Sequence, residues 1–578
     1  MSNSGVMYQL DGKNIKNIEL IVNPPANYAK YDAVINITTK KKSLFDGMLL
    51  TLSNRTLLGY NFTPEAFADI ISNKKRFGYT IRGGYRWDTP IHDYQTTITR
   101  ESVNLNSVTD RLFNGSNKSL SGIVDMNYRI NDNSNISANC NVNKSGKDDY
   151  GNSSFLTNGV LSSKSITNAN TDNLGLSAEI SFLTGQFNKQ SFTAHCLYEY
   201  STLNYLQEIT NEGSYSTISK QEKGGHSSSY TADGSYFIPF SKKSNMKIEA
   251  KFSSSSELNT STYFIIDPTT QILTPLPSEY TNIDNTINNG DASVIYNHKF
   301  GKSAITITGA AHYYLNYAKG TNIDIDYTSI SFVPSIKYNL FISKGTILNL
   351  SYSRNTKAPS IYSLNPIETV SDPFNIFVGN PDLKQEIQNS VSLSINTRIK
   401  KHSLNAILKG DFMSDNIEQV SYLKDSILYT SFQNLSNSKT ITAMLLYSYR
   451  PTRKLNLSLS ANTYYNIYPS RNLFSYRLLF TSLYTIKPTL RLQGNASLLP
   501  VSTNSQTTKV FNLLKYGISL AGNSKNQRWN YNITLNNIGP LSKKSRTYIE
   551  TQSYAISTLN KIQGMSLTFN ISYTIGKI

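Results

Sequence analysis

The sequence predicts an all-β fold, a transmembrane antiparallel up-and-down β-barrel of about 22 strands. Composition is the first of three observations that favour it. Charged residues make up 16 % and hydrophobic residues 38 % of the 578 positions, and Ser, Thr and Asn fill much of the remainder. A barrel wall in lipid needs apolar side chains only at alternate positions, and its lumen accepts neutral polar ones. The other two observations are strict two-residue alternation and a mixture of short turns and long connections.

Apolar and polar side chains alternate in segments spread along the chain. In the last segment, Leu567, Phe569, Ile571, Tyr573 and Ile575 share one face, and Ser, Thr and Asn fill the other. The same pattern occurs at 124–130, 174–182 and 246–252. Successive side chains of a strand point to opposite sides of the sheet, so each segment predicts one apolar wall and one hydrated wall.

Connections of unequal length separate these segments. Residues 450–454 and 487–489 form short turns, whereas 205–228 and 253–290 are long polar links. Short turns at one end and long loops at the other are typical of outer-membrane barrels. Residues 64–71 are expected to form a short piece of helix. A soluble β-sandwich, β-helix or propeller is the alternative, but the last two need a fixed-length repeat, which the sequence does not show.

Charge and cysteine content narrow the class further. The formal charge is +18, and the basic residues are dispersed along the sequence, which favours a solvated or headgroup-facing surface over nucleic-acid binding. A soluble nucleic-acid binder would purify without detergent. Cys140 and Cys196 are too few for a disulfide framework or a CxxC metal site, and two free thiols in strands are expected. No run reaches the roughly 18 apolar residues of a membrane-spanning helix.

The N-terminus contains a Leu-Asp-Gly turn at Asp11 and Gly12, followed by an I-x-x-I-E run that contains Glu19 and ends in Asn23-Pro24. These residues resemble the end of a plug domain in TonB-dependent-receptor-like outer-membrane proteins. Residues 31–41, YDAVINITTKK, are similar to the strand that closes the plug, although the usual preceding glycine linker is missing. The resemblance implies a plug remnant at 1–42 and a barrel at 43–578.

A second stretch, 352–386, is similar to a more specific motif of the same family. Its prolines preclude a regular ladder, so we expect a strand, an extracellular loop and a return strand from near residue 387. The loop either folds over the barrel mouth or contacts ligand directly. The residues that carry the resemblance, and that are candidates for ligand contact, are Arg354, Pro359, Asn365, Pro366, Gly379, Asn380 and Pro381. Ala358 and Gln385 depart from the usual Arg and Pro.

The resemblance implies an outer-membrane transporter of a Gram-negative bacterium that takes up a ligand too large or too scarce for passive pores. Its expected partners are membrane lipid, lipopolysaccharide, an unidentified ligand and a partner lipoprotein, but no nucleic acid. TonB would be a partner only through an N-terminal box and plug. Residues 1–6 do not resemble a secretory signal, so we expect the sequence to be truncated. The alternative is a non-transporting barrel for adhesion or surface structure.

No pattern in the sequence predicts an enzyme, a metal site or a cofactor. Nucleophile-elbow, zinc-protease, P-loop and dinucleotide-binding motifs are missing. Two acidic pairs, Asp148-Asp149 in an expected loop and Asp324 with Asp326 on one strand face, are not part of a calcium loop. The six histidines (His92, His195, His226, His298, His312 and His402) show no metal-ligand spacing.

Overall fold

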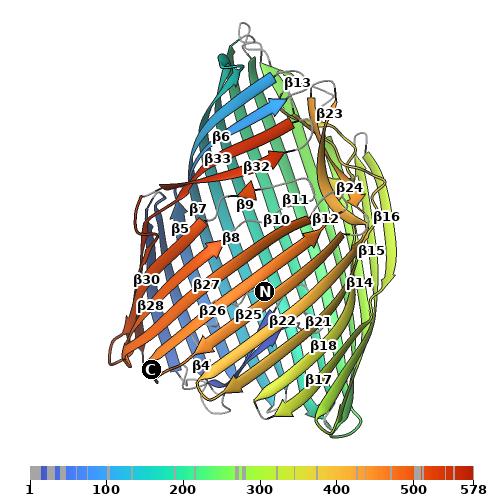
Figure 1. The fold of residues 1–578 in the computed structure, drawn as a ribbon, viewed down its shortest axis with the longest axis vertical. Coiled ribbons are helices and arrows are strands. Elements are labelled where there is room, and N and C mark those ends of the chain that lie inside the picture. The colour runs from blue at the N-terminus through green and yellow to red at the C-terminus, as the bar shows by residue number, and fades with distance from the viewer. Residues whose placement is uncertain are drawn as a thin grey trace.

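The computed structural model describes residues 15–576 except for 23–32, 40–46, 60, 75, 101–104, 132–133, 188–189, 214–216, 267–272, 276–280, 321–322, 344, 373–374, 425–426, 436–437, 469–471, 500–508, 511–512, 541 and 551–553. The described strands form a closed antiparallel barrel with tilted strands (Figure 1). Its circuit has 22 strands, as predicted. In order they are β3 (Gly47–Leu58), β4 (Thr63–Lys74), β5 (Phe77–Asp88), β7 (Leu105–Asn131), β8 (Ser134–Thr157), β9 (Val160–Phe187), β10 (Gln190–Gly213), β11 (Thr217–Pro239), β12 (Ser244–Ile266), β14 (Thr281–Phe300), β15 (Ser303–Gly320), β17 (Ser335–Ser343), β18 (Thr346–Lys357), β21 (Glu386–Ile399), β22 (His402–Ser414), β25 (Ser438–Tyr449), β26 (Leu455–Ile467), β27 (Asn472–Lys487), β28 (Leu490–Leu499), β30 (Leu513–Asn523), β31 (Trp529–Asn536) and β34 (Ser566–Gly576).

The barrel closes where its last strand meets its first. Tyr573 of β34 pairs with Leu52 of β3 in an unbroken antiparallel ladder. Closure leaves no free edge within the membrane, where unpaired backbone groups would have no water to bind. The predicted apolar face lies outside: Ile180 of β9, Phe252 of β12 and Phe569 of β34 are all exposed to the surroundings, where lipid covers them.

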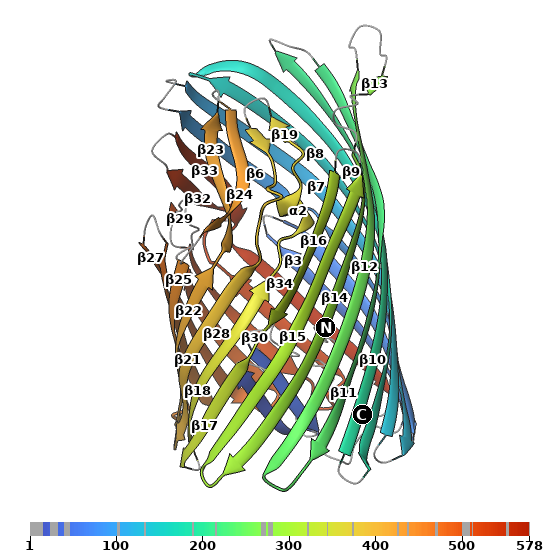
Figure 2. The same ribbon diagram turned by 90° about the vertical axis from the view of Figure 1, so that its right-hand side faces the viewer.

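The strands differ greatly in length around the circuit. We call β7–β12, β14 and β15 the tall wall, because they contain 18 to 28 residues each. The other fourteen strands, β3–β5 and β17–β34 of the circuit, contain 8 to 16 residues and form the short wall. About 9–11 residues cross a bilayer at the usual tilt, so the tall wall continues well beyond the membrane (Figure 2).

Six further strands belong to this upper tier: β6 (Ile91–Arg100), β13 (Leu273–Pro275), β16 (Ile323–Phe332), β29 (Lys509–Val510), β32 (Ser542–Glu550) and β33 (Tyr554–Gln563). β6 continues β5 in the same register beyond Pro90, and β16 leads into β17 through Pro334. Proline interrupts each ladder because it has no N–H to donate. β6 also pairs with β33, which extends the sheet past the top of the short wall.

Three predictions about individual segments are wrong. Residues 64–71 lie in β4, not in a helix, because both edges of β4 are hydrogen-bonded to β3 and β5. Asp148 and Asp149 lie in β8, not in a loop. Residues 205–228 and 253–290, expected as long links, are mostly the upper parts of β10, β11, β12 and β14. The prediction that Asp324 and Asp326 share one strand face is confirmed, because both are exposed on β16.

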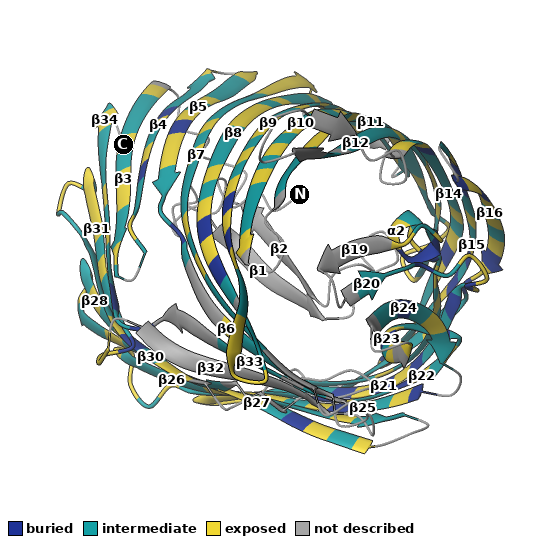
Figure 3. Ribbon diagram, turned by 90° about the horizontal axis from the view of Figure 1, so that it is seen from above, coloured by how far each residue is buried: buried dark blue, intermediate teal, exposed yellow. Residues whose placement is uncertain are grey.

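Two small sheets lie outside the barrel circuit. β1 (Ile15–Val22) and β2 (Ala33–Thr39) form an antiparallel pair. β19 (Thr369–Asp372), β20 (Asn375–Phe377), β24 (Ile427–Leu435) and β23 (Asn416–Lys424) form a four-stranded sheet. Helix α2 (Ile361–Leu364), β20 and β24 lie inside the ring of barrel strands when it is viewed along the barrel (Figure 3). Among the described residues, no helix has the length and apolarity needed to cross a membrane.

Candidate functional site

The segments that fold into the barrel opening form the candidate site, which we call the mouth module: residues 358–385 and 415–437 in their described parts. The chain leaves β18 at Lys357 and returns in β21 at Glu386, close to the predicted return at 387. Pro359 is almost completely buried at the start of this excursion. Ser360 then caps α2 by accepting a hydrogen bond from the Ser363 N–H. The short helix therefore begins from a fixed point.

Asn365, Gly379 and Asn380 join the two ends of the first loop. The Gly379 N–H donates to the Asn365 carbonyl at 2.7 Å, and the Asn380 N–H donates to the Ser363 carbonyl at 2.7 Å. A Cβ at position 379 would lie 2.4 Å from the Asn365 carbonyl oxygen, so only glycine permits this approach. The Asn380 amide also donates to the Phe432 carbonyl at 3.1 Å, which links the loop to β24.

A buried carboxylate fastens the module to the barrel wall. Glu386 accepts a hydrogen bond from the Ile417 N–H at 2.7 Å, where β23 begins, and lies 3.4 Å from the Lys357 ammonium. The Asn434 amide donates to the carbonyls of Lys384 and Asp415 at 2.9 and 2.7 Å. A buried carboxylate needs partners of this kind. Together these contacts, which we call the clamp, fix β23 relative to β18 and β21.

Apolar contacts fasten the other side of the module. Leu364 and Leu383 are buried against Ala318, Ile323 and Ile325 of β15 and β16. Burial beside this core raises the pKa of the Tyr327 phenol, on the extracellular part of β16. The module is thus packed on the inner surface of the wall, as Figure 3 shows for α2 and β24.

Stacked aromatic rings lie on this anchored module, and two of them, Tyr362 and Tyr422, are exposed. The Tyr362 and Phe377 rings stack at 4.4 Å, and Phe432 meets both edge-on at 5.8 Å. Tyr362 is 60 % exposed. On the adjacent hairpin, Tyr422 stacks on Tyr429 at 5.7 Å. Sequence reasoning missed these rings, because their only signal was aromatic residues between prolines.

The predicted site residues have different positions in this arrangement. Asn365, Gly379 and Asn380 come together, and Pro359 is buried. Pro366 and Pro381 are exposed. Arg354 lies in β18, where its backbone N–H donates to the Pro334 carbonyl. The hydrogen bonds of Asn365, Gly379 and Asn380 hold the first loop of the module together. Ligand contact by the seven predicted residues stays a prediction.

Only one of the plug-motif residues can be placed. Glu19 lies in β1 opposite Asn36 of β2. Asp11, Gly12, Asn23 and Pro24 lie outside the described residues.

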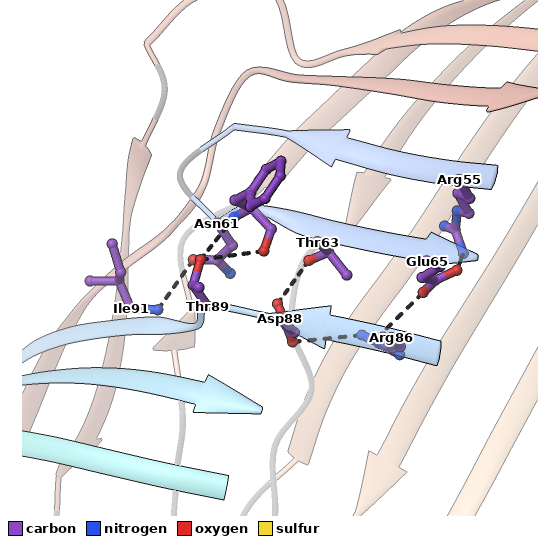
Figure 4. Close-up of polar contacts among 9 residues, drawn as sticks. Arg55, Asn61, Thr63, Glu65, Arg86, Asp88, Thr89 and Ile91 are labelled. Carbon is purple, nitrogen blue, oxygen red and sulfur yellow. Dashed lines mark hydrogen bonds and ion pairs between the residues drawn. The ribbon is translucent and has the colours of Figure 1, made fainter. Parts of the chain in front are cut away.

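The lumen face of the short wall is polar and charged at β3–β5. Glu65 of β4 lies 3.5 Å from both Arg55 and Arg86, which come from the two neighbouring strands (Figure 4). Arg86 in turn approaches Asp88, which accepts from Thr63 at 2.8 Å. Paired charges of this kind suit a hydrated interior.

A second charged group lies on the tall wall. His195 lies 3.0 Å from Glu179 and 2.8 Å from Asp233. In the part of the chain that the structure describes, no group of three His, Cys, Asp or Glu side chains has the geometry to hold a metal ion. Cys140 and Cys196 are exposed free thiols in β8 and β10, as predicted.

The fold and the lumen define a TonB-dependent-receptor-like barrel. Residues 183–573 match the family model described as outer membrane protein beta-barrel family, and the chain belongs to that family. The protein lies in the outer membrane, as predicted. No curated protein sequence matches the chain.

Several solved structures share the fold at low identity. The siderophore receptor PirA from Pseudomonas aeruginosa is 12 % identical over 98 % of this chain and 87 % of its own, with a TM-score of 0.57. A mutant of the ferric enterobactin receptor PfeA from Pseudomonas aeruginosa is 12 % identical over 98 % and 86 %, with a TM-score of 0.62. The copper transporter OprC is 11 % identical over 95 % and 83 %, with a TM-score of 0.64. At these identities the likeness concerns the fold alone.

Proposed function

We propose that this chain is the barrel of an energy-coupled transporter that first holds its ligand at the mouth module. The observation that carries the proposal is an aromatic stack, the exposed Tyr362 on the half-buried Phe377, on a module that is fastened to the inner wall. Rings held rigidly lose little conformational entropy when they contact a ligand. Their position in the opening of a polar lumen suits capture before passage.

The fold neighbours suggest which ligands to test first. They include a siderophore receptor, a ferric enterobactin receptor and a copper transporter. Flat rings stack well on Tyr and Phe faces. We therefore propose a ferric chelate with aromatic groups as the first candidate, with Cu(II) and an oligosaccharide as the competing classes.

The domain division belongs to the same proposal. Residues 1–42 are a plug remnant and residues 43–578 the barrel, and the described β1–β2 pair and the start of β3 at Gly47 are compatible with this division. TonB would act through a plug and an N-terminal box, and a partner lipoprotein would cover the mouth. Asp11, Gly12, Glu19, Asn23 and Pro24 would shape the plug.

Ligand titration of the purified full chain tests the capture step. Isothermal titration calorimetry with ferric enterobactin, Cu(II) and a maltooligosaccharide should show binding of one probe. Tyr362→Ala with Phe377→Ala should weaken that binding about tenfold, the effect expected from losing an aromatic contact. Tyr150→Ala, at an exposed tyrosine of β8, is the control and should leave binding unchanged. No binding of any probe, or equal loss in the control, contradicts the proposal.

Uptake by cells separates transport from surface attachment. Accumulation of the bound probe should stop when a protonophore collapses the energy supply. One observation favours the alternative function, a surface or adhesion barrel. The apolar side chains of Val160 and Leu161 are exposed at the extracellular tip of the tall wall. Binding without energy-dependent accumulation would favour that alternative.

A further inference from the structure

The net charge of the chain is concentrated at one end of the barrel. Ten short turns join the strands at one end of the barrel. Short turns mark the periplasmic end of an outer-membrane barrel. Taken with two residues on each side, they contain 19 of the 56 Lys and Arg and one of the 38 Asp and Glu, Asp132. The difference, +18, equals the formal charge of the whole chain. The basic residues are Lys74, Lys75, Arg76, Lys189, Lys242, Lys243, Lys299, Lys302, Lys344, Arg398, Lys400, Lys401, Arg450, Arg453, Lys454, Lys487, Arg491, Lys525 and Arg528.

Charges in the rest of the molecule balance one another. Subtraction leaves 37 basic and 37 acidic residues, and several of the latter, such as Asp69 and Glu386, are neutralised by a neighbour. By contrast, none of the described turn cations forms an ion pair. Lys242, Lys243, Arg453 and Lys454 are all exposed. The described turn cations, although dispersed in the sequence, therefore meet at one rim, which we call the basic rim; Lys75, Lys189 and Lys344 lie outside the described residues.

Exposed aromatic residues lie directly beside the basic rim. Phe77, Tyr128, Phe300, Tyr484 and Trp529 lie on the outer face of their strands within five residues of a turn, and the exposed Phe240 directly follows Pro239, the last residue of β11. Aromatic girdles mark the level at which an outer-membrane barrel passes from hydrocarbon to headgroups. Except at the 132–133 turn, the nearest turn cation is one to three residues from the ring, so these cations lie at headgroup depth.

The distribution around the rim identifies the kind of partner. Nine of the ten turn segments contain a cation, so the positive charge surrounds the barrel instead of forming a patch on one side. A single docked protein would require such a patch, whereas a ring of lipid contacts the full circumference. Lys and Arg pair well with phosphate oxygens and attract anionic headgroups. We infer that the basic rim binds the anionic phospholipid headgroups of the periplasmic leaflet.

Lipid selectivity of the reconstituted full chain tests this inference. The protein is placed in phosphatidylcholine vesicles, and the relative association of spin-labelled phosphatidylglycerol and spin-labelled phosphatidylcholine is measured by electron paramagnetic resonance. The anionic lipid should be preferred about threefold, as expected for several cations near one headgroup layer. In 1 M salt the preference should approach one, because the screening length falls to about 3 Å. No preference at low salt overturns the inference.

A pair of matched variants locates the effect at the rim. Replacing Lys242, Lys243, Lys400, Lys401, Arg453 and Lys454 with Gln should lower the preference by about half. The control replaces four exposed lysines at the extracellular ends of strands, Lys164, Lys319, Lys439 and Lys515, and it is compared with a rim variant in which only Lys242, Lys243, Arg453 and Lys454 are replaced. It should leave the preference unchanged, and equal losses in both variants overturn the inference. The salt titration of the unsubstituted protein decides the question if either variant does not fold.

Discussion

The tall and short walls are built from the same antiparallel ladder but end in different surroundings. A strand of the short wall, such as β25 with 12 residues, crosses the membrane and stops. A strand of the tall wall, such as β9 with 28, crosses the same layer and then continues into water. The alternation of apolar and polar residues is strong at 174–182 and weak at 160–170 of this one strand. The alternation therefore indicates that the two faces of a strand lie in different surroundings, and it does not by itself indicate whether a strand is present.

The upper tall wall shows how a sheet persists without an apolar face. Around 217–229, β11 consists mainly of Ser, Lys, Gln and Gly, yet it is fully paired with β10 and β12. Backbone hydrogen bonds supply the ladder, and pairing on both sides leaves no free edge there. Hydroxyl pairs such as Ser201 with Ser227, at 2.8 Å, add cross-strand contacts.

A lysine introduced at two heights on β9 should give the largest difference in stability between the membrane-spanning and the extracellular part of the tall wall. Ile180 and Ile166 are both exposed on its outer face, at membrane level and well above it. Ile180→Lys should lower the free energy of unfolding by about 2–4 kcal/mol, because a lysine near the bilayer midplane is poorly solvated. Ile166→Lys should change it by less than about 0.5 kcal/mol. Urea unfolding in lipid vesicles measures both, and equal losses would show that lipid covers the whole wall.

This difference explains which parts of the fold the sequence could predict. Segments 174–182, 246–252 and 567–575 face lipid on one side, so their alternation identified them correctly. The upper strands at 205–228 have water on both faces, and their polar composition resembled a loop. Residues 64–71 looked helical because local propensity says nothing about the ladders that β3 and β5 supply.

The candidate site was predictable only in its chain position. The motif located the loop at 358–385, since prolines and the Gly379-Asn380 pair indicate a departure from the ladder. The partners of these residues lie far along the chain: Phe432 for Asn380 and Ile417 for Glu386. A single sequence contains no signal for such pairings, so the clamp and the aromatic stack came from the structure.

An ion pair in each wall provides a second comparison. In the short wall, the Arg82 guanidinium binds both carboxylate oxygens of Asp69, one of them at 3.2 Å, and Asp69 is 8 % exposed. Arg82→Met leaves this carboxylate without a cation and should cost about 2 kcal/mol. Lys147 pairs with Asp149 in the tall wall, but its side chain is 44 % exposed. Lys147→Met should cost less than about 0.5 kcal/mol. Chemical denaturation of both variants tests the contrast, and similar costs would contradict it.

Two neighbouring glycines of β5 should produce the smallest effect and the finest comparison. A Cβ on Gly84 would lie 2.3 Å from the ring of Phe67, its partner across the ladder, whereas a Cβ on Gly83 would meet nothing within 4 Å. Gly84→Ala must displace that ring and should destabilise the barrel by about 1 kcal/mol. Gly83→Ala restricts the unfolded chain without a clash, so it should stabilise by about 0.5 kcal/mol.

The tall wall contains a similar glycine–phenylalanine pair across the ladder: a Cβ on Gly151 would lie 2.1 Å from the ring of Phe113. Because this pair lies above the membrane, where the sheet can open locally, Gly151→Ala should affect global unfolding less than Gly84→Ala does. Hydrogen exchange should instead show faster opening of the amides near 151. If Gly151→Ala and Gly84→Ala lowered the unfolding midpoint equally, the tall wall would have to unfold with the barrel as one cooperative unit.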